Sequence, residues 1–182
     1  MYNKLLAVLF SFTLFYSCKN TYMSFFTKNR KDIDTIVELY KRTIKNNYFE
    51  LAVNYKSLTN EVLIKAKIDD TNVNTIFNYK EDKDELELFL QKGKVNSSEL
   101  KNLVDKMIEL KCVEIYQHGY LYNGVTNQYQ AFSVALMYNN KTKYKGFAFF
   151  DKNSEYPPGV TESAKKIEDN IYFFETNRSI FE

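Results

Sequence analysis

Residues 113–124 read VEIYQHGYLYNG and carry the clearest fold signal in the chain. Aromatic and β-branched residues are frequent from Val113 to Tyr122, which is typical of a β-strand. The dipeptide Asn123-Gly124 favours a type I′ turn because both residues tolerate positive φ. The sequence therefore predicts a β-hairpin here, whose second strand runs to about Tyr138.

The same pattern of strands and turns continues toward the C-terminus. Asn139-Asn140 predicts another turn, and YKGFAFF at 144–150 predicts the next strand. Pro157-Pro158-Gly159 interrupts the pattern. We expect a short helix at Val160–Ile167 and a closing strand at 171–174, which reads IYFF.

Two segments upstream of the hairpin have the period of an amphipathic helix. The segment 31–45 places apolar residues three and four apart, and 96–110 does the same more regularly. In the second segment Asn96 or Ser97 is the expected N-cap, and Glu99 lies in the first turn. The apolar stripes are Ile33, Ile36, Val37, Tyr40 and Ile44 in the first, and Leu100, Leu103, Val104, Met107 and Ile108 in the second.

Between these helices the apolar period changes to two. Apolar residues alternate with more polar ones over 49–55 and 62–68, which predicts half-buried strands. Further strands are predicted at 73–79 and 86–90, although DELELFLQ at 84–91 also fits a short helix.

This order of elements predicts an α+β fold, with an antiparallel β-sheet of meander strands packed against two main helices. No linker rich in Pro, Gly or Ser divides residues 31–182, so we expect a single domain there. The helix-then-strands order occurs twice, near 31–91 and 97–175, which leaves a duplicated unit as an alternative.

The composition limits the classes of function. The chain has 182 residues, a net charge of +2, 15 Tyr, 15 Phe and no Trp. A near-neutral protein lacks the basic field with which nucleic-acid-binding proteins displace phosphate counterions, so nucleic acid is not an expected partner. A chain of this length buries enough surface to fold without a metal or disulfide.

The N-terminus has the anatomy of a secretory signal peptide. Lys4 gives it a positive charge, and Leu5–Phe15 is an apolar run without charge. The run is shorter than the roughly 20 apolar residues that a transmembrane helix needs. Phe15 suits the A-x-A rule of the ordinary signal peptidase poorly, since cleavage before Cys18 would place it at −3.

The segment Phe15-Tyr16-Ser17-Cys18 resembles the lipobox of bacterial lipoproteins, with bulky aromatic residues where that motif usually has Leu and a small residue. The resemblance implies that residues 1–17 are removed and that Cys18 is acylated and becomes the N-terminus. It further implies a protein held at a membrane of the cell envelope by its lipid. Residues 18–30 would then be a tether, since they carry no clear period.

Two alternatives remain open for this region. A secreted or periplasmic soluble protein would share the leader without the lipid. A Cys18–Cys112 disulfide would compete with acylation, whereas an acylated Cys18 leaves Cys112 as a buried thiol that behaves as a small apolar residue.

No catalytic, cofactor or metal site is predicted from the sequence. His118 is the only histidine, and a regular strand would place it far from the thiol of Cys112. Asp69-Asp70 and Glu81–Glu87 are acid-rich but lack the glycine of a calcium loop, which favours solvated turns. Six tyrosines could form a ligand platform or simply pack across strands: Tyr116, Tyr120, Tyr122, Tyr129, Tyr138 and Tyr144.

These observations predict a lipid-anchored envelope protein that acts as a non-catalytic binding module, with a protein of the envelope as one candidate partner. An envelope inhibitor or immunity-type lipoprotein is the first alternative. A small envelope enzyme is the second.

Overall fold

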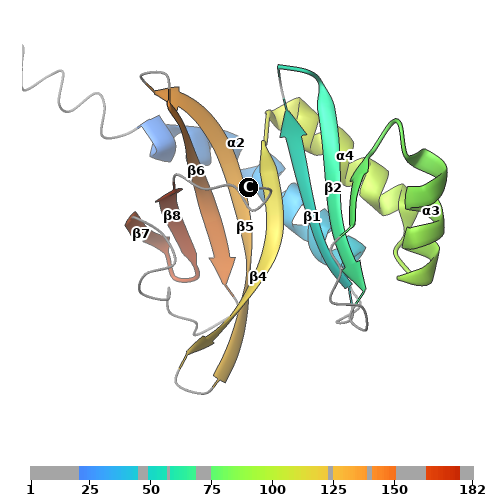
Figure 1. Cartoon of the computed structure of the whole chain (residues 1–182). Coiled ribbons are helices and arrows are strands. Elements are labelled where there is room, and N and C mark those ends of the chain that lie inside the picture. The colour runs from blue at the N-terminus through green and yellow to red at the C-terminus, as the bar shows by residue number, and fades with distance from the viewer. Residues whose placement is uncertain are drawn as a thin grey trace, which may run out of the picture. The chain divides into compact units, whose positions relative to one another are not determined.

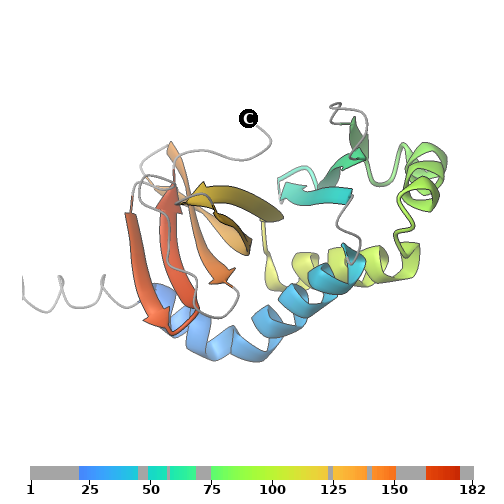
Figure 2. The same cartoon turned by 90° about the horizontal axis from the view of Figure 1, so that it is seen from below.

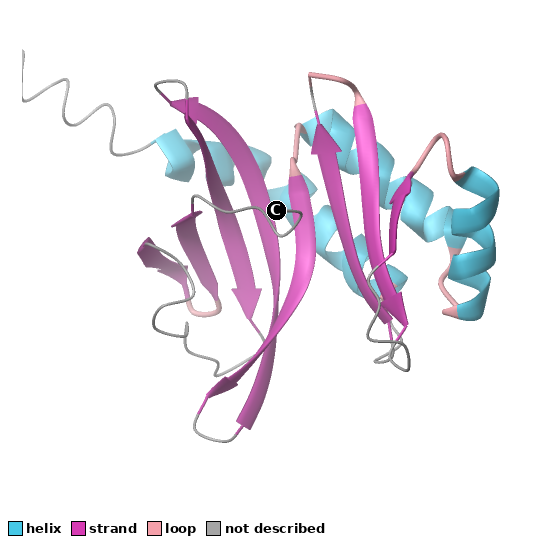
Figure 3. Ribbon diagram, viewed as in Figure 1, coloured by secondary structure: helices cyan, strands magenta, loops and turns pink. Residues whose placement is uncertain are grey.

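The computed structural model describes residues 21–44, 49–56, 58–68, 75–122, 125–138, 141–150 and 163–176. Along these ranges the order is one helix, three strands, two helices and five strands (Figure 3). The elements are α2 (Thr21–Thr43), β1 (Phe49–Lys56), β2 (Glu61–Ile68), β3 (Thr75–Asn78), α3 (Lys83–Lys92), α4 (Ser97–Leu110), β4 (Glu114–Tyr122), β5 (Val125–Tyr138), β6 (Lys141–Phe150), β7 (Ser163–Glu168) and β8 (Ile171–Thr176).

The chain forms two compact units, Met1–Asp34 and Thr35–Glu182, so the boundary falls within α2. In the first unit the described residues are helical, and Arg30 contacts two neighbours one turn away. Its Nε lies 2.8 Å from a carboxylate oxygen of Asp34, and its guanidinium lies 4.8 Å from the ring centre of Phe26. Such pairs one turn apart support a helix locally.

All strands of the second unit that the structure describes belong to one antiparallel sheet. Their order is β3-β2-β1-β4-β5-β6-β8-β7 (Figure 1). The two halves of the sheet join between β1 and β4, where only Ala52–Asn54 pair with Glu114–Tyr116. The observed class is therefore the predicted α+β fold with an antiparallel sheet.

Helix α4 and the Thr35–Thr43 part of α2 lie on one face of the β1–β3 half. Figure 2 shows α4 running along this face beneath β1 and β2. The Thr35–Thr43 part of α2 lies on the same face, where the Tyr40 hydroxyl donates a hydrogen bond to the Leu51 carbonyl. The core of this half consists of buried apolar side chains from strands and helices: Ile36, Val37, Tyr40, Leu51, Val53, Ile64, Phe77, Leu100, Leu103, Val104 and Met107.

Two strands of the other half are buried on both faces. Phe147 and Phe173 are opposite one another in β6 and β8, with ring centres 5.9 Å apart. On the opposite face Ala148, Phe150 and Phe174 form a buried cluster. The continuous apolar runs FAFF and IYFF explain this, since a strand covered on both sides needs apolar residues at every position.

The centre of β1 is also buried on both faces, which corrects the expectation of a half-buried strand. Val53 is 0% exposed, and Ala52 and Asn54, which alternate onto the other face, are 4% and 5% exposed. Asn54 is opposite Glu114 of β4, which is 2% exposed. The alternation of Asn54 with Val53 suggested that one face of β1 is open to solvent, but the folded chain covers both faces of this strand.

The structure confirms the predicted helix 96–110 and the strands at 62–68, 113–122, 125–138, 144–150 and 171–174. Tyr122 pairs with Val125 and Tyr138 with Lys141, so both hairpins have two-residue connections as predicted. The turns themselves, Asn123-Gly124 and Asn139-Asn140, lie outside the described residues.

Three predictions of local structure were wrong. The first helix begins at Thr21, not at 31, so the described part of the predicted tether is helical. The predicted strand at 86–90 is part of helix α3, in agreement with the alternative reading of DELELFLQ. The predicted helix at 160–167 is a strand from Ser163, because Ser163–Glu168 pairs with β8.

Candidate functional site

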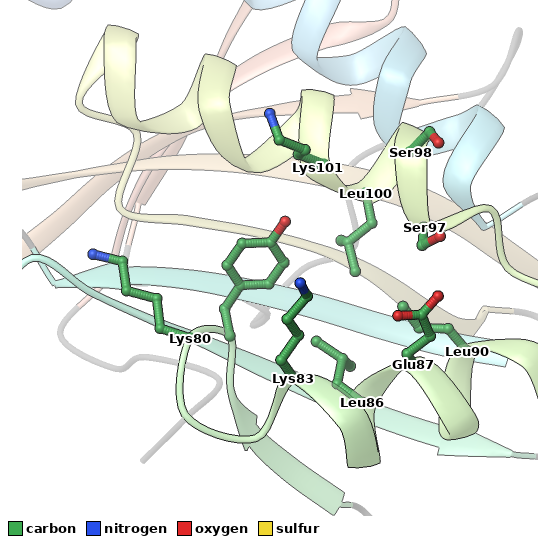
Figure 4. A pocket seen from close by; sticks show the side chains of 10 residues that line it. Lys80, Lys83, Leu86, Glu87, Leu90, Ser97, Ser98, Leu100 and Lys101 are labelled. Carbon is green, nitrogen blue, oxygen red and sulfur yellow. The ribbon is translucent and has the colours of Figure 1, made fainter.

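A cleft of about 490 Å³ lies in the second unit, between α3 and the N-terminal end of α4 (Figure 4). Its lining comes from three consecutive parts of the chain: the turn after β3, helix α3, and the first turn of α4. The lining residues are Tyr79, Lys80, Lys83, Leu86, Glu87, Leu90, Ser97, Ser98, Leu100 and Lys101.

The wall formed by α4 is positioned by a complete N-cap. The Asn96 Oδ1 accepts hydrogen bonds from the backbone N–H groups of Ser98, at 2.9 Å, and Glu99, at 3.3 Å. This bonding satisfies two donors that a helix otherwise leaves open. The cap thus fixes the first turn of α4, where Ser97 and Ser98 line the cleft.

The wall formed by α3 is positioned by the turn that precedes it. The Asn78 Oδ1 accepts from the N–H groups of Lys80, at 3.1 Å, and Glu81, at 3.3 Å. The Asn78 N–H donates to the Asp82 carboxylate at 2.6 Å, and its side-chain amide donates to Glu61 at 3.2 Å. One asparagine therefore connects the β2–β3 pair to the start of α3.

The floor of the cleft is apolar. Leu86 and Leu90 of α3 and Leu100 of α4 are each at most 3% exposed, and Figure 4 shows the three side chains converging between the helices. Leu86 and Leu90 are four residues apart, so they lie on the same face of α3. Phe89 follows in the same helix, and the centre of its ring lies 5.2 Å from the ring centre of Phe77 in β3.

The rim of the cleft is polar and mostly cationic. Lys80, Lys83 and Lys101 line it, with Glu87 as the only carboxylate among the lining residues that the structure describes. The Lys101 ammonium lies 2.8 Å from the Asp105 carboxylate, and this hydrogen bond raises the pKa of Lys101. In Figure 4 Lys83 extends from α3 toward α4.

Tyr79 adds a neutral hydroxyl to this rim. Burial raises the pKa of Tyr79 above its ordinary value of 10.0, and the nearby Asp105 carboxylate raises it further, against a smaller opposing effect of Lys101. The phenol therefore stays protonated at physiological pH and can donate a hydrogen bond to an acceptor in the cleft.

The residues singled out from the sequence lie elsewhere. Cys18 is outside the described residues. Cys112 is 0% exposed, and its thiol donates to the Glu114 carbonyl at 3.5 Å. His118 lies within β4, opposite Tyr129.

The acid-rich segment and the tyrosines are explained by local structure where they are described. Asp82 precedes α3, and Asp84 and Glu85 lie in its first turn, where carboxylates stabilise the positive end of the helix dipole. Asp69-Asp70 lie outside the described residues. Tyr116 packs against the cluster of Ala148, Phe150 and Phe174, consistent with the cross-strand reading.

Sequence reasoning missed the lysine rim. The segment Glu81–Glu87 was interpreted through its acids, whereas Lys83 within it and Lys80 before it line the cleft. A helical period over 83–92 places Leu86 and Leu90 on one face of the helix. It also places Lys83 one turn before Leu86 and Glu87.

No family model, curated protein or solved structure matches the chain. Within the part of the chain that the structure describes, no helix is long and apolar enough to cross a membrane. In those same ranges no three His, Cys, Asp or Glu side chains lie close enough together to hold a metal ion.

Proposed function

We infer that the protein is a lipid-anchored binding module of the bacterial cell envelope, and that the cleft between α3 and α4 is its binding site. The observation that carries the binding role is the cleft itself. It combines an apolar floor with a few polar groups at the rim, which is the usual composition of a ligand site.

The lipid anchor is supported by the N-terminal sequence. Lys4, the apolar run Leu5–Phe15 and the small residue before Cys18 match the order of parts in a lipoprotein signal. An N-terminal diacylglycerol and its amide-linked chain would hold the protein at a membrane, since each buried methylene contributes about 0.8 kcal/mol.

Metabolic labelling with a palmitate analogue tests the anchor. The full chain is produced in a bacterial host as the natural sequence, as Cys18→Ala and as Cys112→Ala. Cys112→Ala is the matched control, because it removes the other cysteine, which is buried in the second unit.

We expect the label in the natural protein and in Cys112→Ala, and its loss in Cys18→Ala. The same fractions should show the labelled proteins in the membrane pellet and Cys18→Ala outside it. Label that persists in Cys18→Ala, or that is absent from the natural protein, contradicts the anchor.

A further inference from the structure

The cationic groups of the cleft differ in whether the protein itself neutralises them. Lys101 is paired with Asp105. Lys80 and Lys83 form no ion pair with any residue that the structure describes, although Glu87 is four residues after Lys83 on the same helix. Two ammonium groups at the rim are therefore available to an acidic ligand.

The helix end beside these lysines has little backbone capacity left for an anion. The N–H groups of Ser98 and Glu99 are already bonded to Asn96. The polar side chains that line the cleft near this end are the hydroxyls of Ser97 and Ser98, the ammonium of Lys83 and the carboxylate of Glu87. The hydroxyls and the ammonium are the groups among them that can bind an anion. The positive end of the α4 dipole adds to the potential at this point.

The floor of the cleft favours a ligand that also has an apolar part. Leu86, Leu90 and Leu100 lie at the base of the cleft, each at most 3% exposed, and carry no hydrogen-bonding side-chain atom, so a ligand that reaches them finds apolar contacts only. An inorganic anion would make no apolar contact with this base, whereas a neutral apolar molecule would leave the two lysines without a counter-charge. A ligand that suits both parts has an anionic head and an apolar body.

Building on the binding role inferred above, we propose that the cleft binds a small organic anion, a carboxylate on an apolar chain. The carboxylate contacts Lys83 and the serine hydroxyls, and the chain lies over the leucine floor. The volume of about 490 Å³ falls within the range of small-molecule sites, roughly 300–1,000 Å³.

Isothermal titration of the purified full chain in non-ionic detergent tests this proposal. Octanoate is the probe, n-octylammonium is the same chain with the opposite charge, and acetate is the head without the chain. The variants are Lys83→Glu, which reverses a rim charge, and Lys92→Glu, which reverses an exposed charge on the same helix outside the cleft lining.

We expect octanoate to bind, and acetate and octylammonium to bind at least tenfold more weakly. Lys83→Glu should weaken octanoate binding at least tenfold, and Lys92→Glu by less than twofold. Raising the salt concentration should weaken octanoate binding, because the rim lysines are exposed to solvent.

Three results would overturn the proposal: no binding of octanoate at about 10 mM, equal binding of octylammonium, or unchanged affinity in Lys83→Glu. Circular dichroism of each variant shows whether it is folded. If the natural protein carried no palmitate label, the proposed lipid anchor would be wrong, and the result of the octanoate titration would still hold. If octanoate did not bind, the proposed ligand would be wrong, and the proposed lipid anchor would be unaffected.

Discussion

The two helices that wall the cleft are held in place by different means at their N-termini. α4 carries its own cap, Asn96, and buries four side chains: Leu100, Leu103, Val104 and Met107. α3 follows Asp82, whose side chain makes no cap hydrogen bond to the helix, and it buries only Leu86 and Leu90. α4 is thus specified largely by its own sequence, whereas α3 depends on the turn at Asn78 and on packing against β3.

At their C-termini the two helices are alike. The N–H of Val95 bonds to the Leu90 carbonyl, and the N–H of Cys112 to the Met107 carbonyl, which is the bonding of a Schellman motif. Each motif places a lysine, Lys94 or Lys111, at positive φ of 53° and 57°. The helices therefore share a stop signal, and the difference between them lies in how each one starts and how deeply it is buried.

The largest expected effects come from the buried leucines of both helices. Leu103→Ala and Leu86→Ala should each lower the free energy of unfolding by about 2–5 kcal/mol, because each leaves a cavity in the core. We expect the larger loss for Leu103, which lies in the more deeply buried helix. Chemical denaturation measures both values.

Leu88→Ala is the control for these variants, since Leu88 is on the same helix as Leu86 but is 61% exposed. Leu88→Ala should change the free energy of unfolding by no more than about 0.5 kcal/mol. A loss as large as that of Leu86→Ala would mean that α3 does not present the face seen here.

The second prediction compares the two asparagines that start the helices. Asn96→Ala should cost about 0.5–2 kcal/mol, as for other N-caps. Asn78→Ala should cost about 1–3 kcal/mol, because it removes bonds to Lys80, Glu81 and Glu61. Denaturation curves of both variants give the comparison. If Asn78→Ala left the free energy of unfolding unchanged while Asn96→Ala lowered it, the turn at Asn78 would not be what positions α3.

The third prediction concerns the shared C-terminal motif. Lys94→Gly and Lys111→Gly should each stabilise the protein by about 0.5–1 kcal/mol, because glycine adopts positive φ without the steric cost that a Cβ carries. The melting temperature measures this gain. Destabilisation of both variants would show that the lysine side chains contribute more than the backbone strain costs.

The smallest effect is expected from Tyr79 and appears only at high pH. Burial, and then the Asp105 carboxylate, raise the pKa of Tyr79 in the folded protein. Its stabilising contribution is therefore complete below pH 10 and is lost as the pH rises through the folded pKa. Tyr79→Phe should match the natural protein near pH 8 and be the more stable of the two near pH 11. The same difference in stability at both pH values would contradict this.

Much of the fold follows from local patterns, and the exceptions have physical causes. The apolar period of 96–110 and the dipeptide Asn123-Gly124 are strong local signals, and both gave the observed elements. In α3 the leucines at 86, 88 and 90 alternate like those of a strand, and only the tertiary structure shows that Leu88 is exposed. The segment Ser163–Glu168 contains good helix formers, but its pairing with β8 overrides that preference.

The candidate site was less predictable than the fold. Lys83, Ser97 and Leu100 are close in sequence, yet no periodic pattern shows that α3 and α4 face each other across a cleft. That arrangement depends on how Asn78 directs the chain after β3 and on the contact between Phe77 and Phe89.

The most direct test of the central claim is a map of octanoate binding by ¹H–¹⁵N NMR of the full chain. We predict that the amide signals of Lys83, Ser97, Ser98 and Lys101 shift together on titration, and that those of Lys165 and Lys166 in β7 do not. Shifts that cluster elsewhere on the protein, or that are the same in Lys83→Glu, would contradict the claim that this cleft is the binding site.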